Sequence, residues 1–382
     1  MNEHAFLAPS SAARWVRCAM SPTLEAAYPE TEASPASLEG TAAHWVVQML
    51  LQGTPVAIDT QAPNGVAVTD EMLEAAILVQ EDIVTTLGEN WRQVLVIEKR
   101  VQIKRVHESA NWGTPDYYAW TVLGDGRRKL IVWDFKYGHG IVEAFENWQL
   151  IDYVAGILGE AEVNGLQDQN TNVDMRVIQP RAFHRDGPVR SWLTVAADLR
   201  GHINRLSMAA DDAMSVTPTA SPHPVACENC RGRHACETLQ RAAYFAADYG
   251  QQGSAVDLTP HALGLELRAL TRAHALLEAR MSGLQAQATS TIAAGKLVPF
   301  WNLESKPGNL KWTKPTAEIL ALGQMMGLDL AKPVDVITPA QAKKAGLPDA
   351  LCNTYAIRPT GSPKLIFDDG SKTRLTFSSS NA

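Results

Sequence analysis

The chain has 382 residues, enough for two or three domains, and its hydrophobic content of 46% is ordinary for a soluble globular protein. No apolar run is long enough to span a membrane, and the first residues lack the basic start of a signal peptide, so we expect a cytoplasmic protein. The formal net charge of −7 gives no sign of a nucleic-acid binder. It does not rule one out, because such a protein must be basic only where the nucleic acid lies.

The N-terminal part of the chain is predicted to be helical. Residues 29–38 are rich in Pro, Ser, Thr and Glu and predict a mobile loop. A helix is expected at 41–52, capped by Thr41 or Gly40, and a second at 70–87, where apolar residues recur at helical spacing. A glycine follows each of these segments and ends the helix.

Strand patterns dominate the next part of the chain. Strands are expected at 93–103 and 112–122, and the continuous apolar run at 130–135 indicates a buried strand. Glu98, inside the first strand, could be a further acidic group near a site, although we expect a structural role for it. Beyond these, the patterns predict a helix at 146–158, strands at 175–179 and 192–195, and a helix at 198–214.

Two acids and a lysine gather at the end of the central strand. Residues i and i+2 share one face of a strand, so Asp134 and Lys136 point into the same space. Asp116 precedes the turn at 123–126, and two strands joined by that turn would bring it beside Asp134. A D-x-K pattern alone is more often a surface pair flanking a core strand, so the neighbouring motifs must decide.

These residue types suit metal-assisted phosphodiester hydrolysis. Two carboxylates supply the hard oxygen ligands that magnesium or manganese prefers, and leave positions for water and phosphate. Such a metal lowers the pKa of a bound water and offsets the charge that develops on the phosphate. A lysine beside it can orient the attacking water or neutralise the pentacovalent state.

The surrounding motifs carry a family resemblance. The letters PD at 115–116 and DFK at 134–136 resemble the signature of the PD-(D/E)XK nuclease superfamily. Gln149 and Tyr153, which lie on one face of a helix, resemble the Q-x-x-x-Y motif of its RecB-like branch. The segment GTAAH at 40–44 resembles the G-T-x-x-H element of the same branch. These motifs follow the family order within about 115 residues.

The resemblance implies a role for each residue. His44, Asp116 and Asp134 would bind magnesium or manganese, together with the backbone carbonyl of Phe135. Lys136 would orient or activate the water and stabilise the phosphorane. In that branch the Q-x-x-x-Y pair lies next to the active centre and contacts DNA, so Gln149 and Tyr153 would position the strand. Taken alone, His44 would be an ordinary helix histidine.

A second constellation involves the cysteines, of which the chain has five. Cys227, Cys230 and Cys236 lie in CENCRGRHAC, a spacing that suits thiolates converging on a metal centre. Disulfides are disfavoured in a protein that looks intracellular. Three thiolates need a fourth ligand, and His234 could replace a cysteine in a zinc site. Cys352 has no partner by spacing and is expected to be a buried thiol.

The cysteine pattern resembles that of RecB-like nucleases of the AddB type. Those proteins carry one cysteine far upstream of the nuclease core and three downstream, and Cys18 occupies the upstream position here. The resemblance implies that Cys18, Cys227, Cys230 and Cys236 hold a [4Fe-4S] cluster that clasps the two ends of the nuclease domain. A structural zinc at the same four thiolates is the alternative.

The expected fold is α/β: a restriction-endonuclease-like core, with a mixed central sheet flanked by helices and an iron-sulfur clasp, plus a C-terminal helical and small α+β region. The predicted parts are a nuclease domain at 1–245, a region with a long amphipathic helix at 246–295, and a small α+β domain of unknown role at 296–382. Apolar residues at three- and four-residue steps place that helix at 260–293, packed on its own domain or forming a dimerising coiled coil.

The expected function is a metal-dependent DNA nuclease, chiefly an exonuclease that processes single- or double-stranded ends in recombination or repair. The layout resembles a family of phage and prophage proteins, so the expected compartment is the cytoplasm of a bacterial host. The chain has no G-x-x-x-x-G-K-[ST] loop, so a helicase, a single-strand-binding protein or a recombination protein would be a partner. The alternatives are a non-cleaving iron-sulfur or zinc DNA-binding module and, more weakly, an RNA-directed nuclease.

Overall fold

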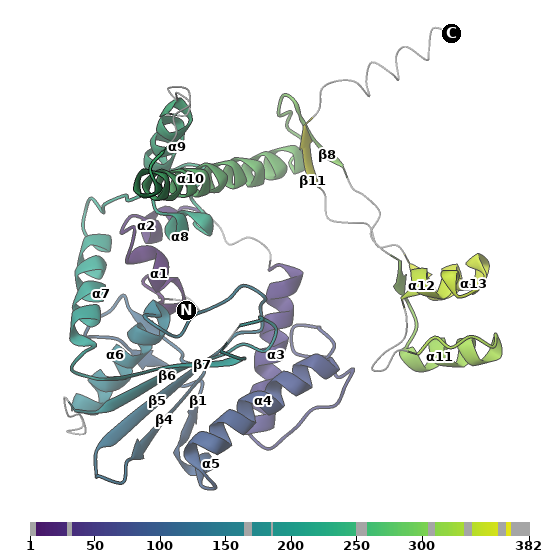
Figure 1. The fold of residues 1–382 in the computed structure, drawn as a ribbon, viewed down its shortest axis with the longest axis horizontal. Helices are drawn as coiled ribbons and strands as arrows, with labels where there is room; N and C mark the ends of the chain where they lie inside the picture. The colour runs from purple at the N-terminus through teal and green to yellow at the C-terminus, as the bar shows by residue number, and fades with distance from the viewer. Residues whose placement is uncertain are drawn as a thin grey trace. The chain divides into compact units, whose positions relative to one another are not determined.

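The structure is a computed structural model that describes residues 5–28, 33–163, 170–184, 186–249, 258–304, 310–331, 338–357 and 364–367. The chain divides into two compact units, Met1–Met281 and Ser282–Ala382. The boundary lies inside the long helix α10 (Pro260–Ala293), which has the bounds predicted from its spacing (Figure 1).

A five-stranded sheet forms the centre of the larger unit, with the strand order β1-β4-β5-β6-β7. Strands β5 and β6 pair in parallel and the other neighbours are antiparallel, which confirms the predicted mixed sheet. Helix α6 (Trp148–Val163) makes the crossover between the parallel pair. The strands are β1 (Leu95–Ile97), β4 (Tyr117–Val122), β5 (Arg128–Phe135), β6 (Asn172–Ile178) and β7 (Val189–Val195).

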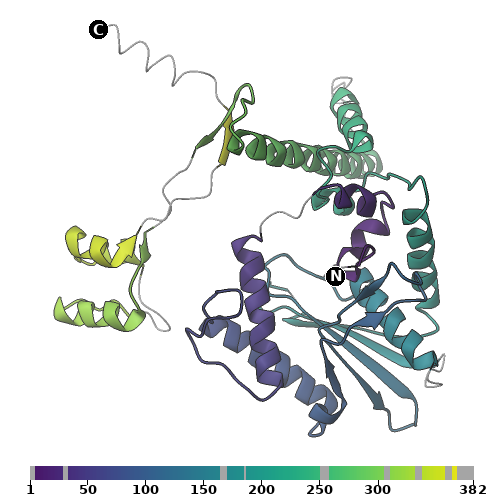
Figure 2. The ribbon, with the colours of Figure 1, turned by 180° about the vertical axis from the view of Figure 1, so that it is seen from behind.

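Helices cover both faces of this sheet, so the central strand β5 is buried on both sides (Figures 1 and 2). Ile131, Trp133 and Phe135 pack in one core with α3 (Pro35–Leu51) and α4 (Asp70–Leu87). The alternate residues of β5 pack in a second core with α6 and α7 (Arg200–Ala213). Asp134 belongs to this second set by its position in the strand, so its carboxylate lies on the α6 side.

Helix α3 begins at Pro35, so the predicted loop was wrong at residues 35–38 and the predicted start near Thr41 was wrong. Residues 33–34 of that loop are non-helical as predicted, and residues 29–32 lie outside the described residues. The Ser34 side chain accepts a hydrogen bond from the Ser37 N–H at 3.1 Å and caps the helix. Pro35 fits the first helical position, where its missing N–H costs nothing. The prediction missed this Ser-Pro start because the segment's polar composition also suits a loop.

The single strand predicted at 93–103 was wrong. Residues Trp91–Val94 form the short helix α5, and the strand β1 ends before Glu98. Glu98 has a positive φ of 45°, a backbone conformation that breaks a strand and is rare for residues other than glycine. Pairing resumes only at β2 (Val101–Gln102), which belongs to a separate two-stranded sheet.

The other predicted elements of this unit are close to the observed ones. The strand predicted at 112–122 divides into β3 (Trp112–Gly113) and β4, because Pro115 between them has no N–H to donate to a ladder. The helix predicted at 146–158 starts two residues later and continues to Val163. The remaining predictions correspond to β6, β7, α7 and the full length of α4.

Short helices bring the N-terminus against the segment that carries the cysteines. Trp15 is fully buried, and its Nε1 donates a hydrogen bond to the Ala8 carbonyl at 3.1 Å. This anchors the first helical segment against α6, in the core on that side of the sheet. The elements are η1 (Pro9–Ser11), α1 (Ala12–Trp15), α2 (Ser21–Ala26), α8 (Pro224–Glu228) and α9 (Glu237–Tyr249).

The smaller unit is a small α+β structure, as predicted. Its hydrophobic core includes Ile319 and Cys352, both fully buried, which confirms the expectation of a buried thiol at Cys352. Strand β8 pairs with β11, and β9 pairs with β10. The elements are β8 (Trp301–Glu304), β9 (Lys311–Trp312), α11 (Thr316–Met325), α12 (Pro339–Lys344), α13 (Asp349–Tyr355), β10 (Ala356–Ile357) and β11 (Lys364–Phe367).

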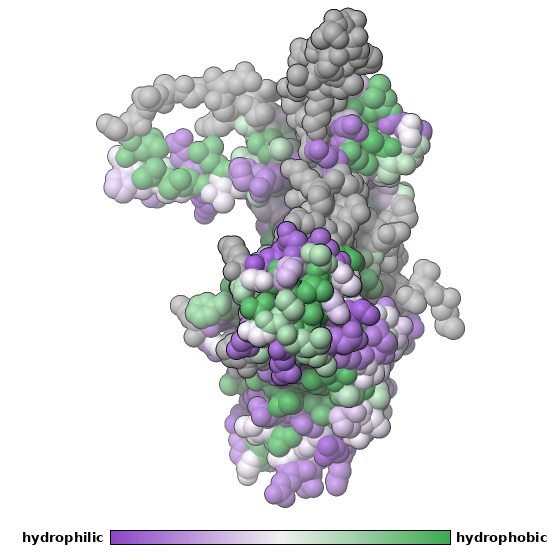
Figure 3. All heavy atoms as spheres, turned by 90° about the vertical axis from the view of Figure 1, so that its right-hand side faces the viewer, coloured by the Kyte–Doolittle hydropathy of each residue, from purple (hydrophilic) through white to green (hydrophobic). Residues whose placement is uncertain are grey.

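Over the parts of the chain that the structure describes, every helix is too short or too polar to cross a membrane. On the face drawn in Figure 3, hydrophobic and hydrophilic residues are interspersed.

Candidate active site

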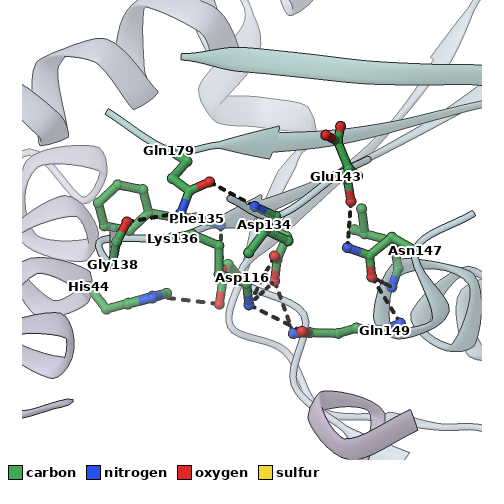
Figure 4. A network of polar contacts seen from close by, with 12 residues as sticks. His44, Asp116, Asp134, Phe135, Lys136, Gly138, Glu143, Asn147, Gln149 and Gln179 are labelled. Atoms are coloured by element: carbon green, nitrogen blue, oxygen red, sulfur yellow. Dashed lines mark hydrogen bonds and ion pairs between the residues drawn. The ribbon is translucent and has the colours of Figure 1, made fainter. Parts of the chain in front are cut away.

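The sheet brings Asp116 and Asp134 together, as the sequence predicted. The antiparallel register of β4 and β5 pairs Tyr117 with Trp133, so the next position along places Asp116 opposite Asp134. The Phe135 N–H donates a hydrogen bond to Asp116 Oδ2 at 2.8 Å and fixes that carboxylate at the strand end. Asp134 is 2% exposed. Figure 4 shows the two carboxylates close to each other and to Lys136.

Lys136 and Gln149 enclose the Asp134 carboxylate. Lys136 Nζ lies 3.0 Å from both oxygens of Asp134 and donates a hydrogen bond to Gln149 Oε1 at 3.1 Å. Gln149 Nε2 donates to Asp134 Oδ1 at 2.9 Å. Asp134 Oδ2 is buried and accepts no hydrogen bond from the described residues, although the ammonium lies within ion-pair distance. This oxygen retains an acceptor position that a cation or a donor could fill.

The start of α6 holds Gln149 in place. The Asn147 side chain accepts hydrogen bonds from the N–H groups of Gln149 and Leu150, at 3.0 and 3.3 Å. This is the capping geometry that satisfies the first amides of a helix. The Gln149 side chain therefore projects from a fixed helix end toward Asp134.

His44 reaches the site from α3, on the other side of the sheet. Its Nδ1 lies 3.6 Å from Asp116 Oδ1, and its ring packs edge-on against Phe135 with the centroids 5.0 Å apart. Burial and the nearby Lys136 charge lower the pKa of His44. The ring is therefore neutral at physiological pH, which is the form of histidine that ligates metals.

Tyr153 lies one turn of α6 after Gln149 and is 7% exposed. Its pKa is raised by burial and by the charges of Asp116 and Asp134, so the phenol stays protonated as a donor. Gly113 leaves room for this ring: a Cβ added there would lie 2.8 Å from Tyr153 Cε1 and 2.8 Å from Pro9 Cγ. The segment just before the Thr-Pro-Asp of the site therefore packs directly on the tyrosine.

We expect Gly113→Ala to destabilise the protein by about 2 kcal/mol, since overpacking a filled site typically costs 1–3 kcal/mol. Chemical denaturation of the larger unit measures this change. Gly124→Ala is the matched control, because a Cβ at Gly124 meets nothing within 4 Å. Equal stability of the two variants would contradict the close packing of Gly113 on Tyr153.

The electrostatics of the two acids favour a cation. Burial raises the pKa of Asp116 from 3.8 to about 6, against the lowering effects of Lys136 and the Phe135 N–H. Burial also raises the pKa of Asp134, while Lys136 lowers it and Asp116 raises it further. One ammonium does not compensate two buried carboxylates, so the site gains from a second positive charge.

Glu98 lies beside this site, the position that the sequence analysis allowed for it when it expected a structural role. Its N–H donates to the Asp116 carbonyl at 2.9 Å. Its pKa is raised by burial and by the charge of Asp116, and lowered by His44, so the three groups are neighbours. The positive φ that breaks β1 turns this residue out of the strand and beside the acids. A strand-period pattern gives no signal of such a turn.

The side chains are neighbours without forming a complete ligand set. Among the described residues, no three His, Cys, Asp or Glu side chains converge closely enough to hold a metal ion. The contacts at this end of the sheet explain why the two carboxylates and the imidazole do not converge on one point. Lys136 and Gln149 bind the Asp134 carboxylate, while His44 faces Asp116. The imidazole, the two carboxylates and the orphaned Asp134 Oδ2 have the donor chemistry that suits magnesium or manganese.

The four cysteines of the predicted cluster come from distant parts of the chain and lie near one another. The pKa of Cys18 is raised by burial and further by Cys236, and that of Cys227 by burial and by the neighbouring Cys18 and Cys236. Burial raises the pKa of Cys230 to about 12, with smaller contributions from Glu25, Cys18 and Cys227. In the absence of a metal these three are thiols.

Backbone donors already point at two of these sulfurs. The Ser221 N–H lies 3.5 Å from Cys18 Sγ, and the Leu239 N–H lies 3.4 Å from Cys236 Sγ. Hydrogen bonds of this kind support the thiolates of metal clusters. His234 is engaged elsewhere, through Nδ1 with the Arg231 carbonyl at 3.2 Å and against the ring of Tyr28.

The larger unit is thus a mixed α/β protein in which buried carboxylates, an ammonium and an amide meet at one end of a five-stranded sheet. Residues 4–373 match the model of the family DUF2800, described as a protein of unknown function. The chain therefore belongs to the DUF2800 family, and the match covers most of both compact units. Since this description names no activity, the function must be argued from the site.

Proposed function

We propose that the chain is a metal-dependent deoxyribonuclease of the PD-(D/E)XK kind, an exonuclease that hydrolyses phosphodiester bonds at DNA ends in phage recombination or repair. One observation carries the proposal: Asp116, Asp134 and Lys136 meet at adjacent strand ends, with Gln149 on the same carboxylate. A divalent cation, when bound, supplies an acidified water and positive charge against the phosphate. Asp116, Asp134 and His44 are the residues that would hold it, with the Phe135 carbonyl.

Lys136 acts in this proposal as a fixed positive charge. Burial alone would lower the pKa of its ammonium, but the charges of Asp134 and Asp116 outweigh burial and raise it. The group is therefore protonated at neutral pH and cannot serve as a general base in this state. It can donate to the attacking water or to a phosphate oxygen and stabilise the charge of the phosphorane.

Gln149 and Tyr153 suit the positioning of the substrate strand. Both project from α6, and the amide of Gln149 already bridges Asp134 and Lys136. When Lys136 turns to a phosphate, the freed Gln149 Oε1 and the protonated Tyr153 hydroxyl offer an acceptor and a donor beside the acids. Their fixed helix end would set the distance between the strand and the carboxylates.

The proposal is tested by incubating the anaerobically purified protein with linear and with circular DNA plus manganese, beside the Asp134→Ala variant. Loss of linear DNA only, abolished in the variant, is the expected result. Cutting of circular DNA as well would show that the enzyme is an endonuclease and not an exonuclease. Binding without cleavage of either substrate would overturn the enzyme proposal in favour of a non-cleaving DNA-binding module that acts with a partner.

We expect Lys136→Ala to lower the cleavage rate by about 10²–10³, the typical effect of removing one donor that stabilises a developing charge. DNA affinity should change by less than about fivefold, because the phosphate backbone contacts many other groups. Single-turnover cleavage and fluorescence anisotropy measure the two quantities. Lys99→Ala, at an exposed lysine paired with Glu160, is the control for loss of one positive charge. Full activity of Lys136→Ala would remove the residue from the mechanism.

A further inference from the structure

A groove lies between the start of α8 and the N-terminal half of α10, away from the acids of the site. It encloses about 750 Å³. His223 and Pro224 form one side, and Leu265, Arg268, Ala269 and Arg272 form most of the other. None of the lining residues is acidic. Figures 1 and 2 show α10 running beside α8 and α9.

Positive charge gathers around this groove. The Arg17 and Arg272 charges both contribute to lowering the pKa of His223, after burial, so both guanidinium groups lie near its ring. Over the described part of the chain, none of Arg17, Arg268 and Arg272 forms an ion pair with a carboxylate. Like charges brought together without a counter-charge favour a bound anion.

The groove also presents directed donors. The Val225 N–H donates to His223 Nδ1 at 3.2 Å, which leaves the proton of the neutral ring on Nε2. Arg272 donates to the Pro222 carbonyl at 2.9 Å, which fixes its guanidinium at the groove edge and leaves other N–H groups free to donate. Arg268 and Arg272 lie one helical turn apart, about 6 Å along the axis. A ligand with repeated negative groups can meet both.

We propose that this groove binds the sugar-phosphate backbone of a DNA strand, an inference that rests on the proposed nuclease function. Guanidinium and imidazole N–H groups match phosphate oxygens. The apolar side chains of Leu265, Ala269 and Pro224 suit the faces of the sugars. The lining has no Phe, Tyr or Trp side chain on which bases could stack, so we expect binding here to be independent of sequence.

The position of the groove relates it to the cysteines. The Cys227 N–H donates to the His223 carbonyl at 2.8 Å, so one wall of the groove and one predicted cluster ligand belong to the same helical turn. A strand that lies in the groove contacts the protein at a second place besides the acids of the sheet.

The test compares Arg268→Gln/Arg272→Gln with Arg92→Gln/Arg241→Gln, a control pair with the same charge change at exposed sites. Both pairs are built in the Asp134→Ala background, in the full chain. Fluorescence anisotropy with a labelled single-stranded oligonucleotide gives the affinity at several salt concentrations. We expect the groove variant to bind roughly tenfold more weakly, with a salt slope reduced by about 1.4, which is about 0.7 for each lost phosphate contact. The control should keep the slope of the parent.

Two outcomes would overturn the inference. An unchanged slope in the groove variant shows that the strand does not lie there; cleavage of linear DNA by the otherwise wild-type chain would then still support the nuclease function. In the second outcome, polyglutamate displaces the labelled oligonucleotide as well as unlabelled DNA does at equal charge, and this displacement is lost in the groove variant. That result assigns the groove to acidic peptides instead. If the chain cleaves DNA and the slope falls as expected, both proposals stand.

Discussion

Asp116→Asn should abolish metal-dependent cleavage and at the same time stabilise the metal-free protein at pH 8. Burial raises the pKa of this carboxyl from 3.8 to about 6, and the side chain is only 18% exposed. Keeping it ionised at pH 8 therefore costs about 3 kcal/mol, since one pKa unit corresponds to about 1.4 kcal/mol. An asparagine is uncharged and avoids this cost, but it is a poorer metal ligand.

The raised pKa of Asp116 determines how the stability difference between wild type and Asp116→Asn changes with pH. A carboxyl with a raised folded-state pKa contributes stability that is complete below pH 3.8 and is lost as the pH rises through about 6. Wild type should therefore lose stability relative to Asp116→Asn across this window and equal it near pH 4. The charged or titratable groups around Asp116 are the same in both proteins; among the described residues they are His44, Glu98, Tyr117, Asp134, Lys136 and Tyr153.

The local geometry accepts the asparagine. Its Oδ1 can take the hydrogen bond that the Phe135 N–H now donates to Asp116 Oδ2. Its amide then turns toward His44 Nδ1, at present 3.6 Å from Asp116 Oδ1, and can donate to the neutral ring. No buried polar group loses its partner, so the charge effect should dominate the change in stability.

Thermal unfolding in EDTA at pH 4 to 8 measures this effect, with an expected rise of about 5 °C at pH 8. Manganese should stabilise wild type and leave the variant unchanged, because only a protein that binds the ion gains stability from it. Asp125→Asn is the control: hydrogen bonds from Arg127 lower the pKa of that exposed carboxyl, so no gain is expected at pH 8. A stabilised variant that still cleaves DNA would remove Asp116 from the metal site.

The parts of this site that the sequence predicted are those fixed by strand geometry. The i, i+2 spacing of Asp134 and Lys136 and the hairpin before them determine which side chains meet, and the pairing of Tyr117 with Trp133 brings Asp116 beside Asp134 as predicted. Helix periodicity likewise placed Gln149 above Tyr153. Each of these relations depends only on the local repeat of the backbone.

The parts that could not be predicted depend on tertiary contacts or on single dihedral angles. Glu98 leaves its strand through one positive φ, for which the residue type gives no warning. The Ser34 cap lies in a segment whose composition suits a loop equally well. Predicting the groove between α8 and α10 requires knowing where α10 packs against the cysteine segment, and the spacing of apolar residues along α10 does not give that position.

Cys230→Ser should lose the brown colour of an iron-sulfur protein and most of its solubility. We expect wild type, purified without oxygen, to contain about four iron atoms per chain. The sulfurs of Cys18 and Cys236 come from opposite ends of the larger unit, so a cluster closes a very long loop of the chain. By analogy with a disulfide that closes a loop of more than 100 residues, loss of this link costs on the order of 4 kcal/mol.

The matched control is Cys352→Ser, at a thiol that is equally buried but lies in the small unit without another cysteine near it. It should lower stability through a buried hydroxyl and leave the iron content unchanged. Metal analysis separates the two candidate centres: zinc in place of iron, lost in Cys230→Ser, would replace the cluster by a structural zinc. Iron and colour retained in Cys230→Ser would contradict a cluster at these cysteines.

Burial raises the pKa of Cys230 to about 12, so a metal that binds there must displace a firmly held proton. The release of the metal should therefore depend steeply on pH as the pH falls.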